Sequence, residues 1–140
     1  MKKNATLTRN AGMAYAIFRL SQQGWKVQRP DKTNKLILQS LDDDKTISVH
    51  VRTVRGREPV PMGENEFNID ESIQFVIVVS EVELACPQIY ILPAEKLKEL
   101  CHVGDTGDGE GFANWLQPPQ YWPFARKWNL IGRGDDGARE

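Results

Sequence analysis

The chain has 140 residues, of which 40% are hydrophobic and 26% are charged, and its formal net charge at pH 7 is −1. This length and composition are typical of one globular domain with a single hydrophobic core. No apolar run approaches the roughly 18 residues of a membrane span, and the first ten residues lack the apolar region of a signal peptide. The two cysteines lack the spacing of a zinc site or a disulfide framework. We therefore expect a cytoplasmic protein with no cofactor and no membrane contact.

The chain begins with one predicted helix and one short strand. Apolar residues at helical spacing predict a helix over residues 6–24, with Gly24 as its C-terminal stop. Residues 25–29 alternate between apolar and polar side chains, which predicts a strand that Pro30 ends.

Two longer alternating segments follow and predict a β-hairpin. Residues 35–41 and 46–55 have the period of two that is typical of strands with one apolar face, and a short polar turn joins them. This pairing places Lys35 opposite Arg52, with His50 beside them. The three side chains are therefore expected to lie together at the open end of the hairpin.

The second half of the chain begins with a long segment, residues 56–72, whose prolines, glycines and acids predict an exposed loop. Residues 73–80 form an almost continuous apolar run, which indicates a strand covered on both faces. A further strand over residues 88–92 leads into a helix over residues 94–101, because Pro93 is favoured in the first turn of a helix.

Three segments of unlike composition close the chain. Residues 103–111 are rich in glycine and acids and predict a loop, whereas residues 112–132 hold three of the four tryptophans and must pack on the body. Residues 133–140 are polar and predict a disordered tail. The whole pattern predicts a single α/β domain over residues 1–132, in which helices flank a mixed five-stranded sheet.

Several short segments give this pattern a more specific reading. They are the helix that contains Gly12 and ends in GWKV, the hairpin KLIL…ISVHVRT, the strand QFVIVV, the step IYILP and the closing WNLIG. In order and spacing they resemble the restriction-endonuclease-like fold of the PD-(D/E)XK nuclease superfamily, in particular its small resolvase-like members. The resemblance covers roughly residues 8–132 and implies an αβββ-β-β-α core.

The same resemblance locates the positions where catalytic residues would lie. Members of that family hold a divalent metal with an acid on the first helix, an acid at the start of the second strand and a (D/E/Q)-x-K motif on the third. By position these fall at Tyr15, Lys35, His50 and Arg52. Cations and an imidazole cannot replace the carboxylates, because Mg²⁺ prefers hard carboxylate oxygens. The resemblance therefore implies a nuclease fold without its catalytic residues and without a metal site.

The alternative is an active Mg²⁺-dependent nuclease with displaced acids such as Asp31, Asp42 and Asp44. Residues 30–31 read PD and residues 43–45 read DDK, so the letters of the motif are present. Their spacing argues against a shared site. A strand of about six residues rises about 20 Å, so an acid before the hairpin and an acid in its turn cannot bind one metal ion.

Charge is divided unevenly along the chain. Residues 1–57 contain 12 Lys/Arg and four acids, a net charge of +8, whereas residues 58–140 contain six Lys/Arg and 15 acids, a net charge of −9. Such halves predict an anion-binding surface on one side, or two faces that pair with each other across a homodimer. The candidate binding residues are the cations of the hairpin and the segment after it: Lys35, His50, Arg52, Arg55 and Arg57.

These cations fit an anionic partner, because arginine offers a planar fork to phosphate or carboxylate and lysine a point charge. The alternative is local pairing, with Glu58 or Tyr15 as the partner. The leading hypothesis is a non-catalytic binding module that contacts nucleic acid, DNA first, or another anionic partner. A homo-oligomeric assembly protein is the other non-enzymatic alternative. The small size and the missing targeting signal are typical of accessory proteins of bacteria or mobile elements.

Overall fold

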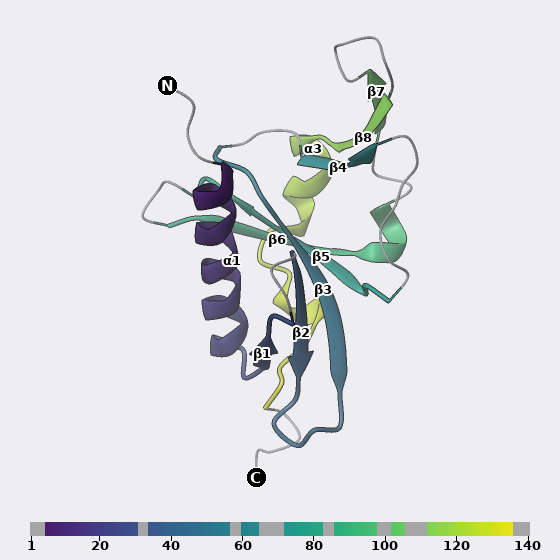
Figure 1. Ribbon diagram of the computed structural model, residues 1–140. Helices are drawn as coiled ribbons and strands as arrows, with labels where there is room; N and C mark the ends of the chain where they lie inside the picture. Colours follow the sequence, from purple (N-terminus) through teal and green to yellow (C-terminus); the bar gives the residue numbers. More distant parts are fainter. Residues whose placement is uncertain are drawn as a thin grey trace.

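The computed structural model describes residues 5–30, 34–56, 60–64, 72–82, 86–97, 102–105 and 112–135. At its centre is an open mixed sheet of five strands in the order β1-β2-β3-β5-β6. Helix α1 lies along one face of this sheet (Figure 1). The predicted α/β class and the mixed five-stranded sheet are thereby confirmed. Of the helices within the described ranges, none is both long and apolar enough to cross a membrane.

The elements of the main sheet follow one another along the first two thirds of the chain. They are α1 (Ala5–Gln22), β1 (Lys26–Gln28), β2 (Lys35–Gln39), β3 (Thr46–Thr53), β5 (Phe75–Ser80) and β6 (Gln88–Pro93). Neighbouring strands are antiparallel except β3 and β5, which run parallel. A parallel pair requires a crossover connection, and the long segment between β3 and β5 supplies it.

A second, three-stranded sheet lies beside the main one. It consists of β4 (Val60–Glu64), β8 (Phe112–Leu116) and β7 (His102–Asp105), in the order β4-β8-β7. The prediction that β4 and most of β7 are loops is wrong. Both strands contain glycine, β4 also contains Pro61 and a register shift, and the partner of β4 lies about fifty residues further along the chain. Local patterns therefore did not reveal this pairing.

Strand β5 shows why the main sheet carries two cores. Ile77 and Val79 belong to the core on the α1 face, which we call the first core. Val76 and Val78 belong to the second core, on the opposite face. All four side chains are fully buried, which confirms a strand covered on both faces.

Helix α1 packs one apolar stripe, including Met13, Ala16 and Leu20, into the first core. Gly12 lies at its closest approach to β3, where an added Cβ would be 1.9 Å from Thr53 Oγ1. The absence of a side chain at Gly12 therefore lets the helix lie directly on the strand.

The C-terminal segment passes around the β6 edge from one face of the sheet to the other. It contains α3 (Pro118–Tyr121), η2 (Trp122–Phe124) and η3 (Trp128–Leu130). Tyr121 is buried in the second core, with its ring centroid 4.7 Å from that of Tyr90. Ala125 then forms an antiparallel bridge with Tyr90, and the segment reaches the first core at Ile131. It thus covers a sheet edge, and the expected packing of this segment on the body is confirmed.

Residues 133–135, where a disordered tail was expected to begin, make defined contacts. The Gly134 N–H donates to the carbonyl oxygen of Gln23 at 3.0 Å, and the Gly134 carbonyl accepts from the N–H of Leu41 at 2.9 Å. Residues 136–140 lie outside the described ranges. After Pro93, the expected helix begins as the short turn η1 (Ala94–Lys96), and residues 98–101 also lie outside the described ranges.

Candidate functional site

The candidate basic residues lie on the polar side of β2 and β3. His50 and Arg52 alternate with Val49 and Val51, which belong to the first core, so the basic side chains lie on the face opposite to α1. Lys35 pairs directly with His50 across the two strands and shares this face. The structure therefore brings Lys35, His50 and Arg52 together, as the alternation predicted.

The register of the hairpin differs from the prediction by two residues, because Lys35 faces His50 and not Arg52. Its cause lies in the turn. The Ser40 N–H donates to the Lys45 carbonyl oxygen at 3.0 Å, and the Ser40 hydroxyl accepts from the Lys45 N–H at 3.0 Å. These bonds pair Ser40 with Lys45, one residue earlier in each strand than the predicted pairing of Lys35 with Arg52 requires. A shift of two leaves every side chain on its predicted face.

His50 is half-buried beside Val76 on the neighbouring strand. Its Nε2 is buried and has no hydrogen-bond partner among the described residues. Burial, with a smaller effect of the Arg52 charge, lowers the pKa of His50 to about 4. The imidazole is therefore neutral at pH 7 and offers a hydrogen-bonding group, not a charge.

Arg52 lies two residues further along β3, beside Val78. Burial lowers the pKa of its guanidinium, and the charge of Arg9 adds to this shift. Its Nε is buried without an acceptor in the described part of the chain, and no described carboxylate forms an ion pair with it. An unpaired donor of this kind costs free energy.

The remaining candidates lie at the edge of this group. Arg55 follows β3 and is exposed, whereas Arg57 lies outside the described residues. Tyr15, one of the two expected local partners, lies on α1, and its hydroxyl accepts from Arg19 at 3.3 Å. Glu58 lies outside the described ranges.

Asp42 and Asp44, two of the displaced acids of the alternative nuclease site, have structural contacts in the hairpin turn. Asp42 accepts from the Ser40 hydroxyl at 2.7 Å and from the Asp44 N–H at 3.1 Å. These bonds lower the pKa of Asp42, the Ser40 bond most strongly. Asp31 lies outside the described residues. Within the described ranges, no three His, Cys, Asp or Glu side chains gather closely enough to hold a metal ion.

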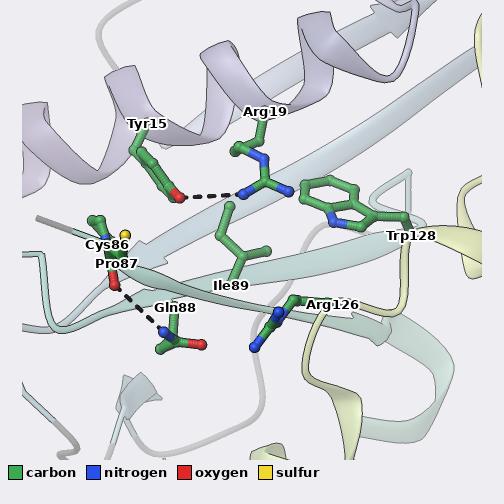
Figure 2. A pocket seen from close by; sticks show the side chains of 8 residues that line it. All are labelled: Tyr15, Arg19, Cys86, Pro87, Gln88, Ile89, Arg126 and Trp128. Atoms are coloured by element: carbon green, nitrogen blue, oxygen red, sulfur yellow. Dashed lines mark hydrogen bonds between the residues drawn. The ribbon is translucent and has the colours of Figure 1, made fainter.

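A second group of cations, which the sequence analysis did not single out, lies near the β6 edge. Arg19 and Arg126 line a pocket of about 340 Å³ together with Tyr15 and Trp128 (Figure 2). These residues are far apart in the chain and meet only in the fold. The one signal in the sequence is a charged Arg19 within an otherwise apolar part of the first helix.

Comparison with protein-family models, curated proteins and solved structures finds no match for this chain. The resemblance to the restriction-endonuclease-like family, and with it the αβββ-β-β-α core, therefore stays a prediction.

Proposed function

We propose that the protein is a non-catalytic binding module that contacts nucleic acid through the basic face, which comprises Lys35, His50, Arg52 and Arg55. The observation that carries this proposal is the half-buried guanidinium of Arg52. Its Nε has no acceptor, and no carboxylate of the described residues pairs with it. A backbone phosphate would supply the missing acceptor through a charge-assisted hydrogen bond.

The strands next to Arg52 leave room for an extended partner. Among the described residues, the second core takes none of its members from β1 or β2, so this part of the sheet face is not covered by it. The polar side chains there include the exposed Gln28, the exposed Lys26, which pairs with Asp43, and the partly exposed Lys35 and Gln39. Two adjoining strands with polar and cationic side chains suit a phosphate backbone, which positions a protein without reading bases.

Nucleic acid is favoured over a small anion because the first 57 residues, which include the residues of this face, carry a net charge of +8. Charge spread over a surface attracts a polyanion and releases its counterions, which makes binding dependent on salt. A phosphate near His50 would also stabilise the imidazolium and raise the His50 pKa from about 4. Binding would then take up a proton, and affinity would increase as the pH falls below 7.

The test is a fluorescence-anisotropy titration of labelled duplex and branched DNA at low and moderate salt, with and without Mg²⁺, with a gel assay for cleavage. We expect salt-dependent binding without cleavage. Arg52→Gln and Arg55→Gln should each weaken binding about five- to tenfold and lower the salt slope by about one. Arg126→Gln, which removes an exposed arginine outside the basic face, is the matched control and should bind as the wild type does.

Two outcomes would contradict the proposal. Cleavage that requires Mg²⁺ would favour the nuclease with displaced acids. Absence of binding even at low salt would favour the assembly protein, which sedimentation of the same samples would test. The outer side of α1 offers a surface for a second copy, because Leu7 and Phe18 are 66% and 56% exposed.

A further inference from the structure

The pocket near the β6 edge lies where the C-terminal segment meets α1. Helix α1 contributes Tyr15 and Arg19, residues 86–89 at and just before the start of β6 form a second side, and the C-terminal segment contributes Arg126 and Trp128 (Figure 2). The described lining contains two arginines and no carboxylate. The pocket is therefore positively charged, with a volume of about 340 Å³ that lies within the roughly 300–1,000 Å³ of small-molecule sites.

Arg19 is held in the wall of this pocket by two aromatic rings. Its guanidinium carbon lies 6.0 Å from the ring centroid of Tyr15 and 5.4 Å from that of Trp128. Its Nη1 also donates to the Tyr15 hydroxyl at 3.3 Å. Cation–π contacts orient a guanidinium without neutralising its charge. The Arg19 charge is thus fixed in position and available to an anion.

Two hydrogen-bond donors at the same place lack acceptors. The Nε of Arg19 and the Nε1 of Trp128 are both buried, and neither has a hydrogen-bond partner in the described part of the chain. Figure 2 shows the two side chains next to each other. Unpaired buried donors cost free energy, and the oxygens of an anion are the acceptors that both donors need.

Arg126 lies across Ile89 from Arg19 (Figure 2). Its φ is 52°, a left-handed conformation that is uncommon for a residue other than glycine, and its N–H donates to the Ile89 carbonyl at 2.9 Å. Backbone strain of this kind is common at ligand-binding sites. The lining on the β6 side includes the apolar side chains of Ile89 and Pro87, so part of this pocket is apolar.

We propose that this pocket binds a small organic oxyanion, a carboxylate or a phosphate attached to an apolar or aromatic group. The oxyanion accepts hydrogen bonds from Arg19 and Trp128, the apolar group contacts Ile89 and Pro87, and Arg126 adds a second positive charge. Trp128 packs against the first core, and Arg19 lies beside it on α1. The basic face lies on the opposite side of the sheet. The two proposals can therefore fail independently.

Isothermal titration calorimetry with three aromatic probes tests this site. Phenylacetate and phenyl phosphate carry the two candidate oxyanions, and phenylacetamide is the neutral counterpart of phenylacetate. We expect at least one anion to bind with a Kd of about 1 mM or tighter. The amide should bind at least roughly tenfold more weakly, because it cannot form the charge-assisted hydrogen bonds. The stronger of the two anions identifies the oxyanion that the pocket prefers.

Three variants locate the binding. Trp128→Phe keeps an aromatic ring beside Arg19 but removes the N–H donor, and Arg126→Gln removes an exposed charge. Each should weaken anion binding about three- to tenfold. Arg55→Gln, on the basic face, should leave it unchanged. Thermal unfolding of each variant shows whether the fold is retained.

A second measurement needs no variant and uses the wild-type protein with and without the anion. Cys86 lines the pocket and is exposed, so a bound anion should slow its alkylation, which peptide mapping distinguishes from that of Cys101. The proposal is overturned if neither anion binds at concentrations up to about 10 mM, tenfold above the expected Kd. Equal affinity for phenylacetamide would also overturn it, as would unchanged affinity in both Trp128→Phe and Arg126→Gln.

Discussion

Single residues of the basic face combine hydrogen-bonding nitrogens with burial. His50 and Arg52 are each half-buried on β3, and in each a nitrogen is without a hydrogen-bond partner among the described residues. Leaving such a group unpaired costs about 1–3 kcal/mol. Proteins tolerate local costs of this size mainly where a site requires them. The two unpaired nitrogens therefore favour a binding role for the pair over a purely structural one.

The low pKa of His50 predicts a pH dependence of stability. The pKa is about 4 in the folded state and 6.5 in the reference state, so the unfolded chain binds more protons between these values. The contribution of His50 to the free energy of unfolding is fully present above pH 6.5 and is lost as the pH falls toward 4. The shift corresponds to at most about 3 kcal/mol, and partial exposure makes the expected change smaller.

The measurement is urea unfolding of the wild type and His50→Gln from pH 4.5 to 7.5. The difference between their free energies of unfolding should change across this range in favour of the wild type at higher pH. Subtraction removes the contribution of carboxylates such as Asp42, whose pKa is also lowered. A difference that does not vary with pH would contradict the burial of a neutral imidazole.

At the scale of elements, the periodicity of the sequence predicted which face of each strand a side chain lies on. The alternation in β3 placed His50 and Arg52 on one face, and the apolar run of β5 indicated burial on both faces. The half-burial of His50 and Arg52 was not predictable, because the second core on the same face is built from distant residues such as Val60 and Tyr121. The pocket at Arg19 was not predictable for the same reason, since three separated segments line it.

The packing of α1 on β3 predicts that Gly12→Ala destabilises the fold. Helix propensity alone favours alanine over glycine by about 1 kcal/mol. Sterics oppose this, because the new Cβ would lie 1.9 Å from Thr53 Oγ1 and 2.4 Å from Thr53 Cγ2. Overpacking costs typically about 1–3 kcal/mol. We expect a net loss of free energy of unfolding, measured by urea denaturation.

Thr53→Ala provides the control for this prediction. It removes both of the closest atoms and leaves only the Cβ of residue 53, at 2.7 Å from the methyl group that Gly12→Ala adds. The double variant Gly12→Ala/Thr53→Ala should therefore be more stable than the sum of the two single changes indicates. Additive losses, or a Gly12→Ala variant as stable as the wild type, would show that the helix does not lie this close to β3.

At the scale of the whole molecule, the C-terminal segment connects elements that are distant in the chain. After it crosses the β6 edge, the Gly132 carbonyl accepts from Trp25 Nε1 at 3.1 Å. Gly134 then bonds to Gln23 at the end of α1 and to Leu41 in the hairpin turn. The helix end, the turn and the C-terminal segment are thus joined at one buried glycine.

Gly134→Ala should therefore weaken together the bonds of the C-terminal segment to Trp25, Gln23 and Leu41. A Cβ at this position would lie 2.6 Å from the Gly24 carbonyl oxygen and 2.7 Å from Trp25 Cδ2. Relief requires the segment to move away, with a loss of about 1–3 kcal/mol in the free energy of unfolding. Because the Leu41 N–H donates to residue 134, its hydrogen-exchange protection should fall by more than that of amides in β5.

Gly132→Asn is the matched control for this experiment. Gly132 has a φ of 83° and open space around an added Cβ, and asparagine tolerates this conformation better than most residues. Its exchange pattern should stay close to that of the wild type. If Gly134→Ala left the protection of Leu41 unchanged, the hairpin turn would not depend on the C-terminal segment. If protection fell at Leu41 alone, with α1 unaffected, the contact would be a local one. Joint loss at the turn and at the end of α1 is expected, because one residue supplies the bonds to both.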